Sequence, residues 1–193
     1  MRVAVSQFAT TSTIEENLAT CLRMINDAAQ CKPDLMVLPE LCNTPSWFVD
    51  HNLAWETALT IDGDFLQAIA AQAKSHQCYI ALGVSLRRDL SREHQDIAVK
   101  SNLSISSCLF SPLGELILLV DKQILLGHEQ DFFISAADIA DETKTGTPNQ
   151  AVGVATTPVG VLGLLTGNDG LTFDVARDST LHSAQLLCQS LST

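Results

Sequence analysis

The chain has 193 residues, 46% of them apolar and 17% charged, and a formal net charge of −11. This length and composition indicate one globular domain, residues 1–193, and exclude a disordered chain. A strongly acidic protein lacks the basic face that nucleic acids require, so no nucleic-acid partner is expected. No segment reaches the roughly 18 uninterrupted apolar residues of a membrane helix, and the N-terminus is too short an apolar run for a signal peptide. We therefore expect no membrane partner and a cytoplasmic location.

The cysteines are widely spaced and form no C-x-x-C pair, which argues against a disulfide framework or a zinc site. We expect most of them to be buried, reduced thiols. No metal or organic cofactor is expected. The six positions are Cys21, Cys31, Cys42, Cys78, Cys108 and Cys188.

Periodicity and turn signals predict elements along the whole chain. The first predicted helix begins with Ser12 as a candidate N-cap and Glu15 three residues later, the spacing of a capping box. Residues 135–150 read as a polar loop. Strands are predicted at residues 2–8, 33–40, 78–86, 101–110, 114–122, 151–158, 160–166 and 183–191, and helices at 12–30, 62–77 and 173–182. This order predicts an α/β fold in which helices pack on a mixed sheet.

Three positions at strand ends could carry chemistry. Glu40 follows a buried strand, where α/β sheets collect functional groups, although most such carboxylates are merely solvated. Lys122 ends an apolar run, and the simple alternative is an ion pair with its neighbour Asp121. Gly167 stands at a sharp turn from strand to helix, where α/β enzymes often place a nucleophile. By itself it is most simply a turn glycine.

Taken together with their flanks, these positions resemble the nitrilase superfamily, the carbon–nitrogen hydrolases, over essentially the whole chain. "DLMVLPEL" resembles the family's strand with the catalytic glutamate, "SNLSISSCLFSPLGELILLVDK" its hairpin with the catalytic lysine, and "TPVGVLGLLTGNDGLTFDVAR" its nucleophile elbow. The positions that match the family pattern are Glu40, Asn102, Gly114, Lys122, Glu129, Gly160, Gly163, Asp169 and Arg177.

The resemblance implies a four-layer αββα sandwich and hydrolysis of a non-peptide C–N bond in a small amide or nitrile. In the family a cysteine thiolate attacks the substrate, a glutamate acts as general base and a lysine stabilises the oxyanion with a backbone N–H near the elbow. These last two roles would fall to Glu40 and Lys122. Glu129 and Asn168 would contact substrate.

Two departures from the family are visible. The nucleophilic cysteine should occupy position 167, which is glycine here, so we expect no covalent hydrolysis by the chain as written. Family members also continue past residue 193, so we expect the sandwich to be incomplete at its C-terminus, with an unpaired strand edge and exposed apolar surface. The full-length family form is expected to be a homo-oligomer.

Three interpretations follow from these departures. The chain is a disabled carbon–nitrogen hydrolase, a non-catalytic pseudoenzyme that binds a ligand or pairs with an active subunit, or a ligand-free α/β domain. Specificity would lie in the loops 43–55 and 125–138. Their aromatic residues could line a pocket, but at these spacings they are more often core. In all but the last interpretation, Glu40, Lys122 and Glu129 should converge, with the ammonium between the two carboxylates.

Overall fold

The computed structural model describes residues 1–88, 103–140 and 153–191. Its first sheet has five strands in the order β1-β2-β3-β4-β5. The first three strands run parallel, and β3, β4 and β5 form antiparallel pairs. The strands are β1 (Val3–Val5), β2 (Leu35–Val37), β3 (Tyr79–Arg87), β4 (Leu103–Phe110) and β5 (Leu116–Asp121).

The second sheet has three strands in the order β6-β7-β8. An antiparallel hairpin joins β6 to β7, and a helical crossover, α5, leads from β7 to its parallel neighbour β8. These elements are β6 (Val154–Thr157), β7 (Gly160–Thr166), α5 (Phe173–Leu181) and β8 (Leu186–Ser190).

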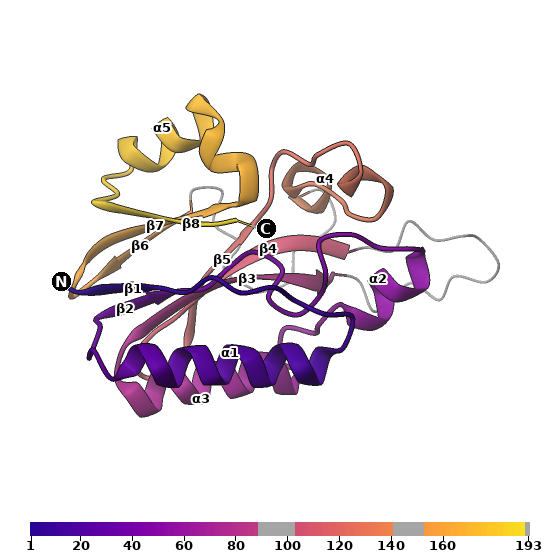
Figure 1. Ribbon diagram of the computed structural model, residues 1–193. Coiled ribbons are helices and arrows are strands. Elements are labelled where there is room, and N and C mark those ends of the chain that lie inside the picture. The colour runs from indigo at the N-terminus through magenta and orange to yellow at the C-terminus, as the bar shows by residue number, and fades with distance from the viewer. Residues whose placement is uncertain (89–102, 141–152, 192–193) are drawn as a thin grey trace.

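The two sheets face each other, and helices cover their outer faces (Figure 1). Helices α1 (Ile14–Ala29) and α3 (Asp64–His76) lie on the first sheet, and α5 lies on the second. The layers are therefore α, β, β and α, as the resemblance implied, but without the remainder of the sandwich that longer relatives have. Shorter helices α2 (His51–Thr57) and α4 (Ala136–Ala140) lie in the connections.

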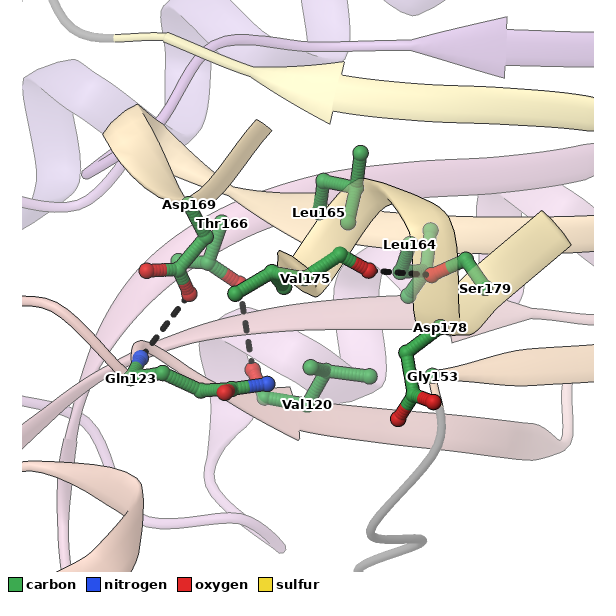
Figure 2. Close-up of a pocket in the computed structure, with 10 residues that line it drawn as sticks. All are labelled: Val120, Gln123, Gly153, Leu164, Leu165, Thr166, Asp169, Val175, Asp178 and Ser179. Atoms are coloured by element: carbon green, nitrogen blue, oxygen red, sulfur yellow. Dashed lines mark hydrogen bonds between the residues drawn. The ribbon is translucent and has the colours of Figure 1, made fainter. Parts of the chain in front are cut away.

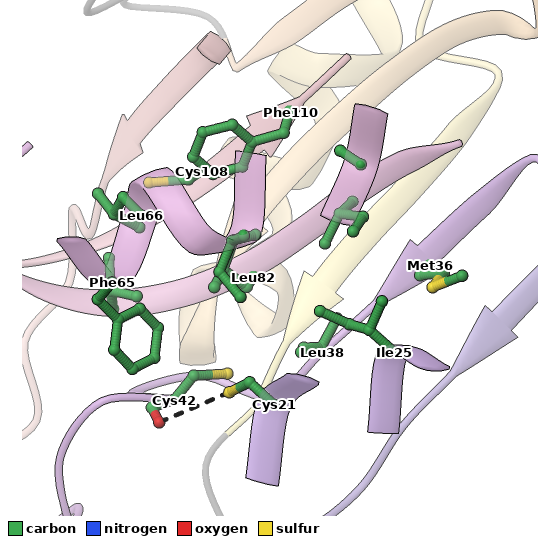
Figure 3. Packing of buried hydrophobic residues seen from close by; sticks show 14 of the residues in the cluster. Cys21, Ile25, Met36, Leu38, Cys42, Phe65, Leu66, Leu82, Cys108 and Phe110 are labelled. Atoms are coloured by element: carbon green, nitrogen blue, oxygen red, sulfur yellow. Dashed lines mark hydrogen bonds between the residues drawn. The ribbon is translucent and has the colours of Figure 1, made fainter. Parts of the chain in front are cut away.

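Two apolar clusters hold the layers together. One lies between the first sheet and its helices, where Cys21 and Ile25 of α1 and Phe65 of α3 pack toward strand residues such as Leu82 (Figure 3). The other lies between the sheets, where Leu109 of β4 belongs to the same cluster as residues of β7 and β8. Strand β2 is buried along its whole length because both clusters cover it, which explains its continuous apolar sequence.

Several element predictions need correction. The strands form two sheets, not the one mixed sheet predicted. Strand periodicity shows that one face of a strand is buried, but it does not show which element covers that face, so it could not divide the strands between two sheets. The capping box is also wrong, since Thr13 is the N-cap of α1 and makes no side-chain cap bond. The side chain of Asn17 ties this end down instead, accepting from Thr11 N and donating to Asn43 O. Helices α2 and α4 were not predicted.

The β4–β5 hairpin is confirmed. Gly114 in its turn has φ +82°, a left-handed conformation that glycine adopts without strain. Asn102, predicted to open β4, lies outside the described residues. Among the helices that the structure describes, none has the length and apolar character needed to cross a bilayer. The assignment of residues 1–193 to one domain stays a prediction.

Candidate active site

Glu40 lies just past β2, in a short segment that β3 and β8 hold in place. Its backbone N–H donates to the carbonyl of Leu191, 3.3 Å away, and Gly83 N–H donates to Pro39 O at 3.0 Å. A Cβ on Gly83 would lie 2.7 Å from Glu40 Cα, so the absence of a side chain at position 83 allows β3 to approach this closely. The next residue, Leu41, has φ +54°, an uncommon conformation for a residue with a branched side chain. The carboxylate is thus placed by the backbone around it.

Lys122 follows β5 and is almost completely buried, with 1% of its surface exposed. Its Nζ donates to Glu40 Oε1 at 3.0 Å and to Glu129 Oε1 at 2.7 Å. The predicted convergence, with the ammonium between two carboxylates, is therefore what the structure shows. The simple alternative, a pair between Lys122 and its neighbour, is wrong: Asp121 accepts hydrogen bonds from Ser106 and Arg88.

Glu129 begins a 3-10 turn, η1 (Glu129–Asp131), and is also buried. While Oε1 accepts from the lysine, Oε2 accepts from Leu126 N at 2.7 Å. The second bond folds the segment after Lys122 back on itself and fixes the carboxylate. Burying two carboxylates with a single ammonium remains costly unless further donors satisfy them, as Leu126 does here.

The elbow joins β7 to a second 3-10 turn, η2 (Gly167–Leu171). Gly167 has φ +52° and is buried. A Cβ added there would lie 2.6 Å from Lys122 Nζ and closer still to Glu40 Oε1, nearer than real Cβ atoms approach their neighbours. Residue 167 is therefore directly against the Glu40 carboxylate and the Lys122 ammonium. The ends of the Glu40 and Lys122 side chains occupy the space that a side chain on residue 167 would need.

Buried polar groups tie this elbow to both sheets. Asp169 accepts from Gln123 N at 2.8 Å and Ile124 N at 2.9 Å, which links η2 to the segment after Lys122. Burial raises the pKa of the Asp169 carboxyl, and the two backbone donors oppose that rise. Between the sheets, Thr166 Oγ1 donates to Ser107 Oγ at 2.9 Å.

The remaining predicted residues are less involved. Asn168 lies in η2, and its buried Oδ1 has no hydrogen-bond partner among the described residues. The contact of Asn168 with substrate stays a prediction. Arg177 is exposed on α5. Within the described ranges, no three His, Cys, Asp or Glu side chains group as metal ligands would.

The aromatic residues of the two loops divide between core and surface. Phe48 and Phe133 are buried, with ring centroids 5.7 Å apart, whereas Trp47 is 67% exposed. Trp47 stacks on His128 at 5.5 Å, beside Glu129. The core interpretation therefore holds for Phe48 and Phe133, whereas Trp55 and Phe132 are half-buried against them and Trp47 is exposed.

A cavity of about 10 Å³ lies behind the elbow, between β5, β7 and α5, and Figure 2 shows the residues that line it. Thr166 and Asp169 line it, together with Ser179, but Glu40, Lys122 and Glu129 do not. A space of this size can hold about one water molecule. It is thus a packing feature of the elbow, separate from the triad of Glu40, Lys122 and Glu129.

A four-layer αββα sandwich with a buried Glu-Lys-Glu triad beside a strand-to-turn elbow defines a nitrilase-like α/β protein. The family model for carbon–nitrogen hydrolases matches residues 2–193, and the chain belongs to that family. No curated protein matches it.

Solved structures of the nitrilase superfamily share the fold. An amidase from Nesterenkonia AN1, in a form with a cysteine-to-alanine substitution, is 18% identical with a TM-score of 0.70, over 99% of this chain and 64% of that one. A form of that amidase in which acrylamide has added to the active-site cysteine is 16% identical with a TM-score of 0.69, over 98% and 66%. A carbon–nitrogen hydrolase from Helicobacter pylori G27 is 18% identical with a TM-score of 0.67, over 98% and 59%. This chain thus spans about two thirds of the length of these proteins.

Proposed function

We propose that this chain is a non-catalytic carbon–nitrogen hydrolase, a protein with the site of a small-amide hydrolase but without its nucleophile. One observation carries the proposal: residue 167 lies against Glu40 Oε1 and Lys122 Nζ and is glycine. Glu40 would be the general base of such a site and Lys122 the oxyanion donor, with Glu129 in contact with substrate. The related Nesterenkonia amidase has an active-site cysteine, to which acrylamide can add.

The size of the rate losses expected for each missing group excludes catalysis by the remaining residues alone. Loss of one oxyanion donor costs roughly 10²–10³ in rate, whereas loss of the nucleophile from a catalytic unit costs roughly 10⁶. The triad therefore serves here to hold three segments together around a buried charge. A small amide or nitrile as ligand, a cytoplasmic location and a homo-oligomeric longer form complete the proposal, on the basis of family membership and the acidic composition.

The direct test is a hydrolysis screen of simple amides, nitriles and carbamoyl compounds, followed by intact-protein mass spectrometry. We expect no turnover and no covalent adduct. Turnover accompanied by a trapped thioester would contradict the proposal, because it would require a nucleophile elsewhere in the chain.

A second test asks whether position 167 is the nucleophile position. In the Gly167→Cys variant the flexible ends of Glu40 and Lys122 must move aside to admit the new side chain. The thiol should then lie beside the Lys122 ammonium, which lowers a thiol pKa below its usual value of about 8.5. Cys31 is the exposed cysteine, so the experiment belongs in a Cys31→Ser background. Burial raises the pKa of Cys78 and Cys188 to about 11 and that of Cys108 to about 12, so these thiols should stay slow.

The measurement is the rate of iodoacetamide labelling between pH 5 and 9, with the Cys31→Ser protein as control. The assignment of residue 167 as the nucleophile position is supported if one additional cysteine labels quickly and its labelling rate rises with pH at values below the usual thiol pKa. If the new thiol labels like any ordinary cysteine, residue 167 is not held against the triad in solution.

A further inference from the structure

The outward-facing side chains of β8, and that of Gln185 immediately before the strand, each lie over a glycine. Alternate residues of this strand point away from the first sheet. A Cβ on Gly160 would lie 2.8 Å from Gln185 Oε1, a Cβ on Gly163 would lie 2.7 Å from Leu187, and a Cβ on Gly170 would lie closer still to Gln189. Large side chains on β8 are thus matched to glycines along β7 and the elbow. The pairs are Gln185 over Gly160, Leu187 over Gly163 and Gln189 over Gly170.

The two glutamines of this row end on backbone groups. Gln185 Oε1 accepts from Val161 N at 3.0 Å, near the start of β7. Gln189 Nε2 donates to the carbonyl of Gly167 at 2.9 Å, at the opposite end of that strand. The second bond reaches the residue that faces the triad.

The elbow needs such an anchor. η2 is a five-residue 3-10 turn, a structure with poor hydrogen-bond geometry, and it contains glycine at positions 167 and 170. Glycine permits many backbone conformations, so the weak i→i+3 hydrogen bonds of the turn are the main local restraint on the peptide between Gly167 and Asn168. The C=O and N–H of a trans peptide point in opposite directions. Holding the Gly167 carbonyl toward Gln189 therefore directs the Asn168 N–H away from it.

We propose that Gln189 is a positioning residue that fixes the orientation of the Gly167–Asn168 peptide. It keeps the carbonyl on the α5 side and the Asn168 N–H on the other, as a backbone donor near the elbow requires. The role deepens the proposed function, because it assumes that the elbow belongs to the same site as Lys122. Its test needs no catalytic activity.

The experiment is NMR on the isotope-labelled 193-residue protein, comparing Gln189→Met with Gln185→Met. Both variants remove a carboxamide, one from β8 and one from the residue immediately before it, but only the first removes the bond to Gly167. In Gln189→Met we expect shifts and microsecond-to-millisecond exchange at Gly167 C′ and Asn168 N. The bond's usual strength predicts a flipped-peptide population raised about two- to tenfold. In Gln185→Met these signals should match the parent.

Equal spectra at residues 167–168 in the two variants would overturn the proposal. If Gln189→Met does not fold, the unaltered protein still decides the matter. Its Gln189 carboxamide protons should exchange slowly with water and show contacts to the α-protons of Gly170, and their absence would overturn the proposal. Amide turnover would refute the proposed function while leaving these spectra unchanged, so the two failures are distinguishable.

Discussion

Lys122 is a single positive charge buried between the carboxylates of Glu40 and Glu129. It contributes to stability because burying these two negative charges without the ammonium would be costly. Removing one partner of a buried ion pair typically destabilises a protein by about 3–5 kcal/mol. We expect Lys122→Met to lower the free energy of unfolding in urea by about that amount at pH 7.

Lys74→Met is the matched control for this prediction. Lys74 is exposed on α3, and its replacement should change the unfolding free energy by no more than about 0.5 kcal/mol. Equal, small effects of the two substitutions would show that the triad contributes nothing to the stability of the fold.

Asp169 makes a pH-dependent contribution whose sign follows from its raised pKa. A carboxyl with a higher pKa in the folded state binds its proton more tightly there, so its titration favours folding below the unfolded value of about 3.9. This contribution is lost as pH rises through the folded pKa. Asp169→Asn removes the titration and turns an amide N–H₂ toward Gln123 N or Ile124 N, which leaves a buried backbone donor unpaired.

We therefore expect Asp169→Asn to be less stable than the parent by about 1–3 kcal/mol in acid. The difference should shrink as pH rises from about 4 toward neutrality. Thermal unfolding of both proteins across that range measures it. A difference that grows with pH would mean that the folded carboxyl has a lowered pKa.

At the scale of elements, β3 packs closely against the backbone of the Glu40 segment. A Cβ on Gly83 would meet the Glu40 backbone at 2.7 Å, and backbone moves far less readily than the end of a side chain. We expect Gly83→Ala to cost about 1–3 kcal/mol in unfolding free energy, the usual range for overpacking. Gly127→Ala, where a Cβ meets nothing within 4 Å, should be neutral. A neutral Gly83→Ala would show that the segment is loosely held.

The sequence predicts the strands and the hairpin from periodicity and turn signals. The meeting of Glu40 with Lys122 follows from the family resemblance, since the residues alone left each with a simpler interpretation. It did not predict α2, although Asp50 is a good N-cap whose side chain accepts from Leu53 N at 2.9 Å. The helix is only seven residues long, too short for a clear period of apolar positions. Short helices of this kind depend on tertiary packing that a linear pattern does not contain.

The contacts of β8 with the site could not be predicted from the sequence either. The bond from Gln189 to Gly167 spans 22 residues, and it depends on which face of β8 points outward. A small clue exists, since glycines at positions 160, 163 and 170 lie opposite large residues of β8 once the register is known. Register, however, is set by the pairing of whole strands. Position 167 stands out in the sequence as a strand-to-helix turn, but its interpretation as the nucleophile position comes from the family resemblance.

At the scale of the whole molecule, α5 covers the outer face of the second sheet, and large apolar side chains at its start and just before it are exposed to solvent. Leu171, the last residue of η2, and Phe173, the first residue of α5, are 79% and 77% exposed. Single exposed apolar residues are ordinary, but neighbouring ones commonly mark a surface that associates. We expect the protein to self-associate with increasing concentration, as light scattering would report.

If these two side chains drive the association, Leu171→Ser with Phe173→Ser should reduce it while leaving the melting temperature nearly unchanged, since neither residue is buried. Leu113→Ser provides the control, because Leu113 is 69% exposed in the turn between β4 and β5, far from α5 in sequence. A decrease confined to the α5 variant supports an interface on the outer layer. Equal decreases would mean that association is a general effect of surface hydrophobicity, and no association in the parent would remove the basis for an interface on α5 altogether.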